Sequence, residues 1–197
     1  NIYGNAGVAP LMIIGTVPLY NVAAVLILSF TGPGSHSLDK ASLKKSVYGI
    51  LTNPIIIGIL LGMAVSALRI PFPVILTKTI GNISVLATPL ALLGLGAGFE
   101  GRKALKQIAP TMVASALKLV ILPAIFLPLA ISMGFTREKL VAILIMLASP
   151  TTVSCYIMAK NMGHEGVLTS SVVVTTTFLS SITLTAWIFL LRSMGLI

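Results

Sequence analysis

Six apolar runs, each long enough to cross a lipid bilayer, constrain the fold of this chain more than any other feature. A membrane-spanning helix needs about 20 consecutive, mostly apolar residues. The six runs cover residues 8–30, 47–68, 79–99, 108–133, 140–159 and 167–191. A buried soluble core can mimic one such run, but not six in succession. We therefore expect an all-α, polytopic membrane protein with six transmembrane helices.

The charge content supports a location in lipid. Only 9% of the 197 residues are charged, whereas a soluble domain carries about a quarter. The net charge of +9 reflects the rarity of acids, four against thirteen bases. This charge suits anionic lipid headgroups or an anionic cargo. The chain has no clustered basic arm that would indicate a nucleic-acid partner.

The connectors between the runs differ in charge and predict an orientation. Seven bases lie in the connectors on one side of the membrane: three in 36–45, three in 100–106, and Lys160. Five bases lie in the connectors on the opposite side. Cytoplasmic loops carry the excess of Lys and Arg. We therefore expect 36–45, 100–106 and 160–165 in the cytoplasm, the C-terminus outside, and a multi-pass protein of the cell membrane.

A short stretch that occurs twice in similar form predicts an internal repeat. Residues 4–8 read GNAGV and residues 163–167 read GHEGV, each directly before a long apolar run, and five spans separate them. An odd number of spans inverts the second copy, which is the inverted-topology repeat of secondary transporters. Because Asn1 is not an initiator Met, we also expect about four spans upstream. The expected domains are then 1–35, the last span of the first repeat; 36–46, a cytoplasmic connector; and 47–197, the second five-span repeat.

The fifth run contains a proline near its middle, in ASPTTVSCYIMAK at 148–160. Pro150 removes a backbone hydrogen bond and clashes with the preceding turn. Hydroxyl and thiol side chains surround it, namely Ser149, Thr151, Thr152, Ser154 and Cys155. One interpretation is a kinked helix whose hydroxyls bond its own carbonyls. The other is a break, after which a half-helix beginning near Thr151 directs its N–H groups and positive dipole end at a carboxylate in the membrane centre.

Lys118 is a charged residue deep within the fourth run. It lies ten residues from Ile108, about 15 Å along a helix, which is the centre of a ~30 Å hydrocarbon slab. An ammonium group there marks a functional cavity by default. The alternative is a structural Lys118 that is neutral or bonded to carbonyls freed by Pro123. No Asp or Glu falls within any run, so the available charges favour a negative cargo.

Polar residues elsewhere in the runs are less specific. Asn21, Asn53 and Asn82 are either links between helices or ligands, and the ten Ser and Thr of the last run receive no single assignment. The candidate substrate-binding residues are Ser149, Pro150, Thr151, Thr152, Lys118 and Asn82. The sequence has no P-loop, metal-ligand cluster or catalytic acid–base arrangement. We therefore expect no enzyme activity, no metal site and no cofactor.

Four stretches resemble the auxin efflux carrier family as found in bacteria: TVPLYNVAAVLILSF (16–30), LTNPIIIGILLGM (51–63), ATPLALLGLGAGF (87–99) and ASPTTVSCYIMAKNMGHEGV (148–167). The resemblance implies ten spans in two inverted five-span repeats, with the fourth and ninth helices unwound at the substrate site. The stretch around Pro150 matches the ninth. This chain would then hold span five and the complete second repeat.

The resemblance also implies a function, secondary active transport of small organic anions, carboxylates above all, by rocking one helix bundle against another. Plant carriers have Asn-Pro at the crossover, whereas Ser149 precedes Pro150 here, so auxin-type recognition is not implied. The alternatives are sodium-coupled uptake of amphipathic anions, as in bile-acid symporters, and a non-transporting receptor subunit. The expected partners are the organic anion and the bilayer, and a homodimer is one assembly that we consider.

Overall fold

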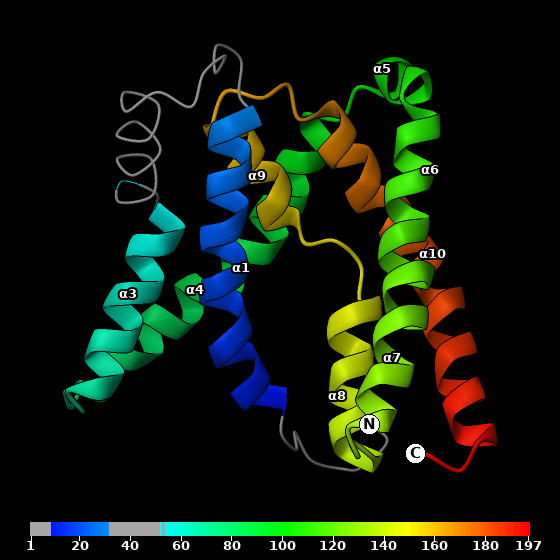
Figure 1. The fold of residues 1–197 in the computed structure, drawn as a ribbon. Coiled ribbons are helices and arrows are strands. Elements are labelled where there is room, and N and C mark those ends of the chain that lie inside the picture. Colours follow the sequence, from blue (N-terminus) through cyan, green and yellow to red (C-terminus); the bar gives the residue numbers. More distant parts are fainter. Residues whose placement is uncertain (1–8, 32–51, 53) are drawn as a thin grey trace. The chain divides into compact units, whose positions relative to one another are not determined.

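In the computed structural model, the described residues are 9–31, 52 and 54–197, and every regular element among them is a helix (Figure 1). The expectation of an all-α fold is thereby confirmed for this part of the chain. The elements are α1 (Ala9–Thr31), α3 (Pro54–Ala67), α4 (Val74–Ala97), α5 (Gly101–Lys106), α6 (Ile108–Ala116), the π-helix η1 (Leu117–Ile121), α7 (Leu122–Ser132), α8 (Arg137–Ala148), α9 (Val153–Asn161) and α10 (Val167–Ser193).

The chain forms two compact units. The first contains Phe99–Thr152 and Gly166–Ile197, together with residues up to Gly15. The second contains Thr16–Gly98 and Val153–Glu165. Helices α5 to α8 and α10 therefore belong to the first unit, whereas α3, α4, α9 and most of α1 belong to the second.

Three helices of the described residues are long and apolar enough to cross a membrane, rather than the six expected. They are Val74–Ala97, the continuous rod Ile108–Ser132 formed by α6, η1 and α7, and Val167–Ser193. Helices α8 and α9 make a fourth if the pair counts as one span. Shorter apolar stretches occur in α1 and α3. The connector 36–46 and the start of the second run lie outside the described residues.

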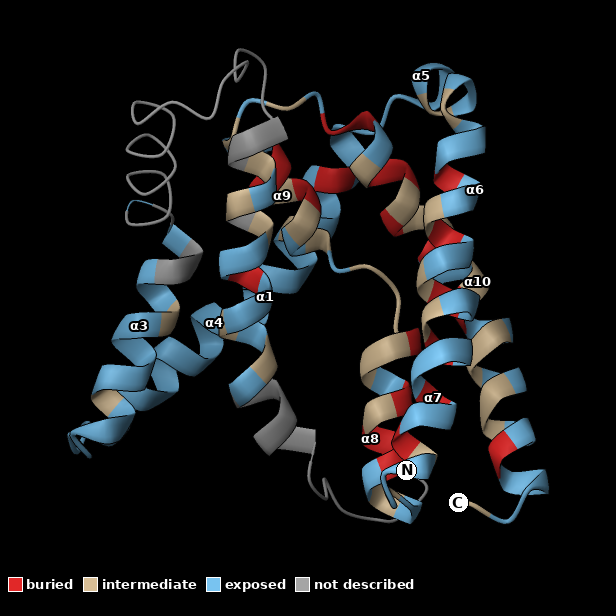
Figure 2. Cartoon of the chain, in the orientation of Figure 1, coloured by how far each residue is buried: buried red, intermediate tan, exposed pale blue. Residues whose placement is uncertain are grey.

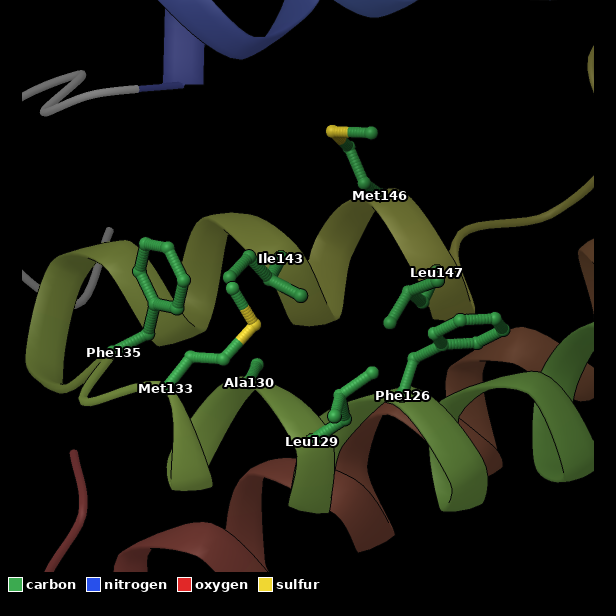
Figure 3. Close-up of a pocket in the computed structure, with 8 residues that line it drawn as sticks. All are labelled: Phe126, Leu129, Ala130, Met133, Phe135, Ile143, Met146 and Leu147. Atoms are coloured by element: carbon green, nitrogen blue, oxygen red, sulfur yellow. The ribbon is translucent and has the colours of Figure 1, made fainter.

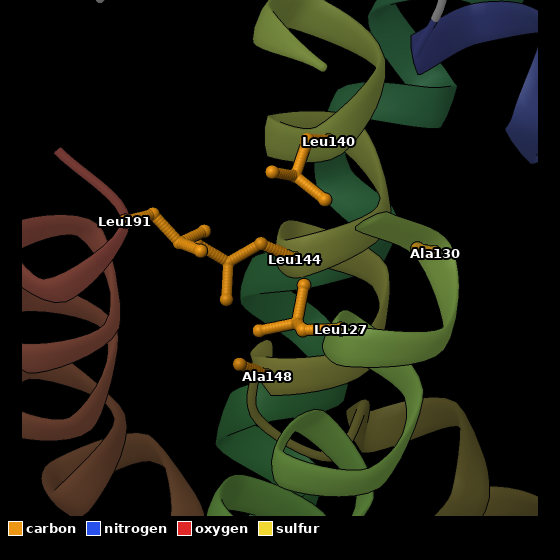
Figure 4. Packing of buried hydrophobic residues seen from close by; sticks show 6 residues of the cluster. All are labelled: Leu127, Ala130, Leu140, Leu144, Ala148 and Leu191. Carbon is orange, nitrogen blue, oxygen red and sulfur yellow. The ribbon is translucent and has the colours of Figure 1, made fainter. Parts of the chain in front are cut away.

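Leucine and alanine side chains hold the first unit together where α7, α8 and α10 meet. The buried cluster comprises Leu127, Ala130, Leu140, Leu144, Ala148 and Leu191 (Figure 4). The three members on α8 are spaced four residues apart, so they share one face of that helix. Much of α6 is exposed in Figure 2, and the exposed residues of α6 and α10 include large apolar ones such as Val113, Phe178 and Phe189, which suits helices that face lipid tails.

A π-helical turn interrupts the long rod of the first unit at Lys118. In an α-helix, the carbonyl of Leu119 would accept a bond from residue 123, but Pro123 has no N–H. The indole Nε1 of Trp187, on α10, donates to this carbonyl at 3.0 Å instead. Wide π turns of this kind are frequent at functional sites. The rod thus carries a local distortion, held by α10, at the position of its half-buried charge.

Replacing Trp187 by Phe should lower the stability of the protein. The aromatic ring remains, but the Leu119 carbonyl loses its donor, and a hydrogen bond between membrane helices contributes about 0.6–1.7 kcal/mol. The midpoint of thermal unfolding in detergent should fall, whereas Phe189→Leu, at a position that is 74% exposed, should leave it unchanged. An unaltered midpoint in Trp187→Phe would show that this bond does not stabilise the rod.

Candidate functional site

Helix α8 ends at Ala148 for a reason that can be read from the next two residues. A residue that precedes proline is pushed out of the helical conformation by the proline ring. Ser149 precedes Pro150 and has the extended backbone angles φ −66° and ψ 152°. Residues 149–152 are not helical, and α9 begins at Val153. The sequence SPTT therefore separates two short helices.

The last turn of α8 has a carbonyl that Pro150 leaves without its helical donor. The N–H of Ser149 still bonds the carbonyl of Ile145 at 2.9 Å. The next carbonyl, that of Met146, would need the N–H of residue 150, which proline lacks. The ammonium Nζ of Lys118 donates to this carbonyl at 3.3 Å. The side chain of Lys118 therefore reaches from η1 to the end of α8.

This contact differs in one respect from the carbonyl-bonded form of the structural alternative for Lys118, because the carbonyl lies four residues before Pro150 rather than beside Pro123. That alternative paired Lys118 with a carbonyl freed by Pro123, but Trp187 donates to the Leu119 carbonyl instead. The lysine is half-buried and turns toward the interrupted region of α8. Its bond to Met146 uses one of the three N–H donors of an ammonium.

The backbone after Pro150 is held by α10. The N–H of Thr151 donates to the hydroxyl Oγ1 of Thr176 at 3.1 Å, and this hydroxyl donates in turn to the carbonyl of Val172 at 2.7 Å. Thr176 is completely buried, with 0% exposure. One threonine therefore links the non-helical segment to α10, and it is one of ten Ser and Thr residues in that run, from which the sequence did not single it out.

The first unit holds five of the six candidate residues. Ser149, Pro150, Thr151 and Thr152 form the segment after α8, and Lys118 reaches the carbonyl four residues before Pro150. We call this group, together with the Met146 carbonyl, the Lys118 site. Asn82 belongs to the second unit, where its side chain is exposed on α4, so it is not a member of this group.

The amide of Asn21 makes its bond within its own helix rather than between helices. Asn21 is 3% exposed, and its Nδ2 donates to the carbonyl of Val17 in its own helix at 2.7 Å. Asn53 lies outside the described residues. Within the part of the chain that the structure describes, no group of three or more His, Cys, Asp or Glu side chains could hold a metal ion.

An apolar cavity of about 230 Å³ lies between α7 and α8 in the first unit (Figure 3). Its lining is formed by Phe126, Leu129, Ala130, Met133, Phe135, Ile143, Met146 and Leu147. Met146 thus belongs both to this lining and, through its carbonyl, to the Lys118 site. The cavity suits a hydrocarbon group and offers no charged side chain to a guest.

A simple rule would have found part of this arrangement in the sequence. Counting four residues back from a proline within a helix identifies the carbonyl that loses its donor. The rule gives Met146 for Pro150 and Leu119 for Pro123, and both carbonyls receive a side-chain donor. The donors themselves, Lys118 and Trp187, are 28 and 68 residues away from their acceptors, so no local pattern reveals them.

Comparison with known proteins agrees with the resemblance of the four stretches. A family model described as "Membrane transport protein" matches residues 10–188, which is most of the chain. No curated protein and no solved structure was found to match. The matched range includes every helix of the Lys118 site and the segment around Pro150. The chain therefore belongs to the auxin efflux carrier family of membrane transport proteins.

Proposed function

We propose that this membrane transporter carries small organic anions, carboxylates above all, by secondary active transport across the cell membrane. The observation that carries the proposal is the bond between the Lys118 ammonium and the Met146 carbonyl. It directs a positive charge from the middle of a membrane-spanning helix to the interrupted end of α8. Ionisable groups inside membrane proteins are costly and are typical of substrate pathways.

The hydrogen-bond acceptor of Lys118 favours an anionic guest. A backbone carbonyl is neutral, and the only ion pair between described residues joins Lys103 and Glu100, both exposed. The ammonium is therefore solvated by a dipole rather than neutralised by a carboxylate of this region. A carboxylate guest would replace or join the Met146 carbonyl through charge-assisted hydrogen bonds, which are roughly twice as strong as neutral ones.

The segment after Pro150 would complete the site. In the proposal, α8 and α9 form one interrupted span of a ten-span, inverted-repeat carrier, and the non-helical segment after Pro150 borders the guest. Thr176 would hold the non-helical backbone in place, since it binds the N–H of Thr151.

The test uses the full-length protein reconstituted into lipid vesicles. Uptake is measured for a short monocarboxylate, a dicarboxylate and an aromatic carboxylate, each paired with its uncharged amide. The proposal expects saturable uptake of at least one carboxylate and no uptake of the matching amide. Equal uptake of acid and amide would contradict a site built on Lys118. Saturable binding without flux would favour the receptor alternative instead.

A second candidate cargo, a larger amphipathic anion, is favoured by the apolar cavity between α7 and α8. A carboxylate at Lys118 would leave its hydrocarbon part close to α8, where Met146 contributes to the cavity lining. The aromatic member of the vesicle panel tests this candidate. Uptake of that compound alone, with a strict requirement for sodium, would favour the sodium-coupled alternative over the first proposal.

A further inference from the structure

We infer that Ser115 is an additional cargo-binding residue, whose hydroxyl donates to the carboxylate held by Lys118. The inference rests on the proposed function and adds a residue that the sequence did not single out. Ser115 lies on α6 with a side chain that is 1% exposed. Its hydroxyl oxygen is buried and has no hydrogen-bond partner. A buried donor without an acceptor is costly, so its presence calls for an explanation.

The other buried hydroxyls of the first unit behave differently. Each of them donates to a carbonyl three or four residues earlier in its own helix, and they are Thr111, Ser170, Ser171, Thr176 and Ser180. Such back-bonding is the usual solution for Ser and Thr in membrane helices. Ser115 could donate to a carbonyl of the preceding turn, as Thr111 does, and yet its hydroxyl makes no such bond. Its hydroxyl therefore differs from the others in having no acceptor among the described residues.

Ser115 lies close to Lys118 along the chain. It is three residues before Lys118, near the end of α6 and just before the π-helix η1. A long helical side chain also extends back over the preceding turn, which for Lys118 is the turn of Ser115. Ser115 and Leu119 are both buried and four residues apart, and the Leu119 carbonyl bonds Trp187 of α10. The serine thus faces α10 and borders the Lys118 site.

Helix α10 packs against α6 and also binds the non-helical segment of the Lys118 site. Helices α6 and α10 run in the same direction in Figure 1, and Thr176 lies three turns before Trp187 along α10. Thr176 binds the N–H of Thr151 in the segment after Pro150. The unpartnered hydroxyl therefore lies on α6, which packs against α10 and continues into η1, where Lys118 reaches α8 and the Leu119 carbonyl bonds Trp187 of α10.

The chemistry of these neighbours selects the guest. An ammonium group repels a metal cation, so the free hydroxyl is suited to donate rather than to coordinate sodium. A carboxylate has two oxygens and can accept from Lys118 with one and from Ser115 with the other. Binding would then satisfy a donor that the empty protein leaves unpaired. Ser115 would lower the stability of the empty carrier and strengthen its hold on the cargo.

The experiment compares Ser115→Ala with Ser180→Ala in the purified full-length protein. Ser180 is also a buried serine, but its hydroxyl donates to the Thr177 carbonyl. The midpoint of thermal unfolding is measured without cargo, and the Kd is measured for a carboxylate that the vesicle panel shows to be transported. Ser115→Ala should raise the midpoint of the empty protein by about 2 °C or more, and should raise the Kd about tenfold. Ser180→Ala should do neither.

Two outcomes would overturn the inference, and two comparisons show whether the proposed function fails with it. A lower or unchanged midpoint in Ser115→Ala would mean that the hydroxyl already has a partner, such as a fixed water or the Thr111 carbonyl. An unchanged Kd would mean that it does not contact the cargo. If Lys118→Ala abolishes binding while Ser115→Ala preserves it, only the role of Ser115 fails. If the wild-type protein binds no carboxylate, the proposed function fails together with it.

Discussion

Replacing Lys118 by Ala should reduce carboxylate uptake about 100-fold, the largest effect that we expect from any single substitution. The variant removes the only charge of the rod Ile108–Ser132 and the hydrogen bond from Lys118 to the Met146 carbonyl. A 100-fold loss corresponds to ~2.7 kcal/mol, which lies within the range of a hydrogen bond to a charged group. Initial uptake rates, measured in vesicles that contain equal amounts of folded protein, test this prediction.

Two further variants separate the role of this charge from a general effect of charge removal. Lys103 is exposed on α5 and pairs with Glu100 at 2.9 Å, so Lys103→Ala should retain the wild-type rate. Lys118→Arg keeps the charge but changes its geometry, and should give an intermediate rate. Wild-type uptake in Lys118→Ala would remove this residue from the transport mechanism.

Replacing Pro150 by Ala should reduce uptake at least tenfold while it makes the protein more stable. Alanine restores the N–H that the Met146 carbonyl lacks and lifts the restriction on Ser149. Helix α8 can then extend past Ala148, and the restored N–H competes with Lys118 for its carbonyl. Vesicle uptake and the midpoint of thermal unfolding test the two effects, and slower amide hydrogen exchange at residues 149–152 would show the added helix.

Pro128 supplies a matched control for this substitution. It lies inside α7 of the same unit, but the helix continues through it to Ser132. Pro128→Ala should therefore leave carboxylate uptake unchanged. If Pro150→Ala also transports at the wild-type rate, the interruption after α8 is not required for function, and the kinked-helix interpretation of this segment would be the better one.

The positions of the long helices follow closely from the apolar runs. The run 108–133 corresponds to the rod Ile108–Ser132, and the run 167–191 to α10, which ends two residues later at Ser193. The third helix begins earlier than its run, at Val74 rather than at residue 79. Lys78 limited the predicted run, but a lysine near a helix end can extend its ammonium toward water while its stem remains in apolar surroundings.

The site was harder to predict from the sequence than the helices. Pro150 and Lys118 could be identified because a proline and a charge are unusual in apolar runs, and because proline acts on a known backbone position. The side chains that bind the backbone close to Pro150 and Lys118 could not be identified. Thr176 and Trp187 bind backbone atoms 25 and 68 residues away, and such pairs depend on which helices meet in space. Ser115 is recognisable only once its missing hydrogen bond is seen.

Equilibrium binding of a radiolabelled carboxylate to the purified full-length protein tests the central claim most directly. The claim is that the Lys118 ammonium, beside the interrupted end of α8, holds a negatively charged guest. We expect saturable binding to the wild-type protein and to Lys103→Ala, competition by other carboxylates but not by their amides, and loss of binding in Lys118→Ala. Equal affinity of Lys118→Ala and the wild-type protein would contradict the account.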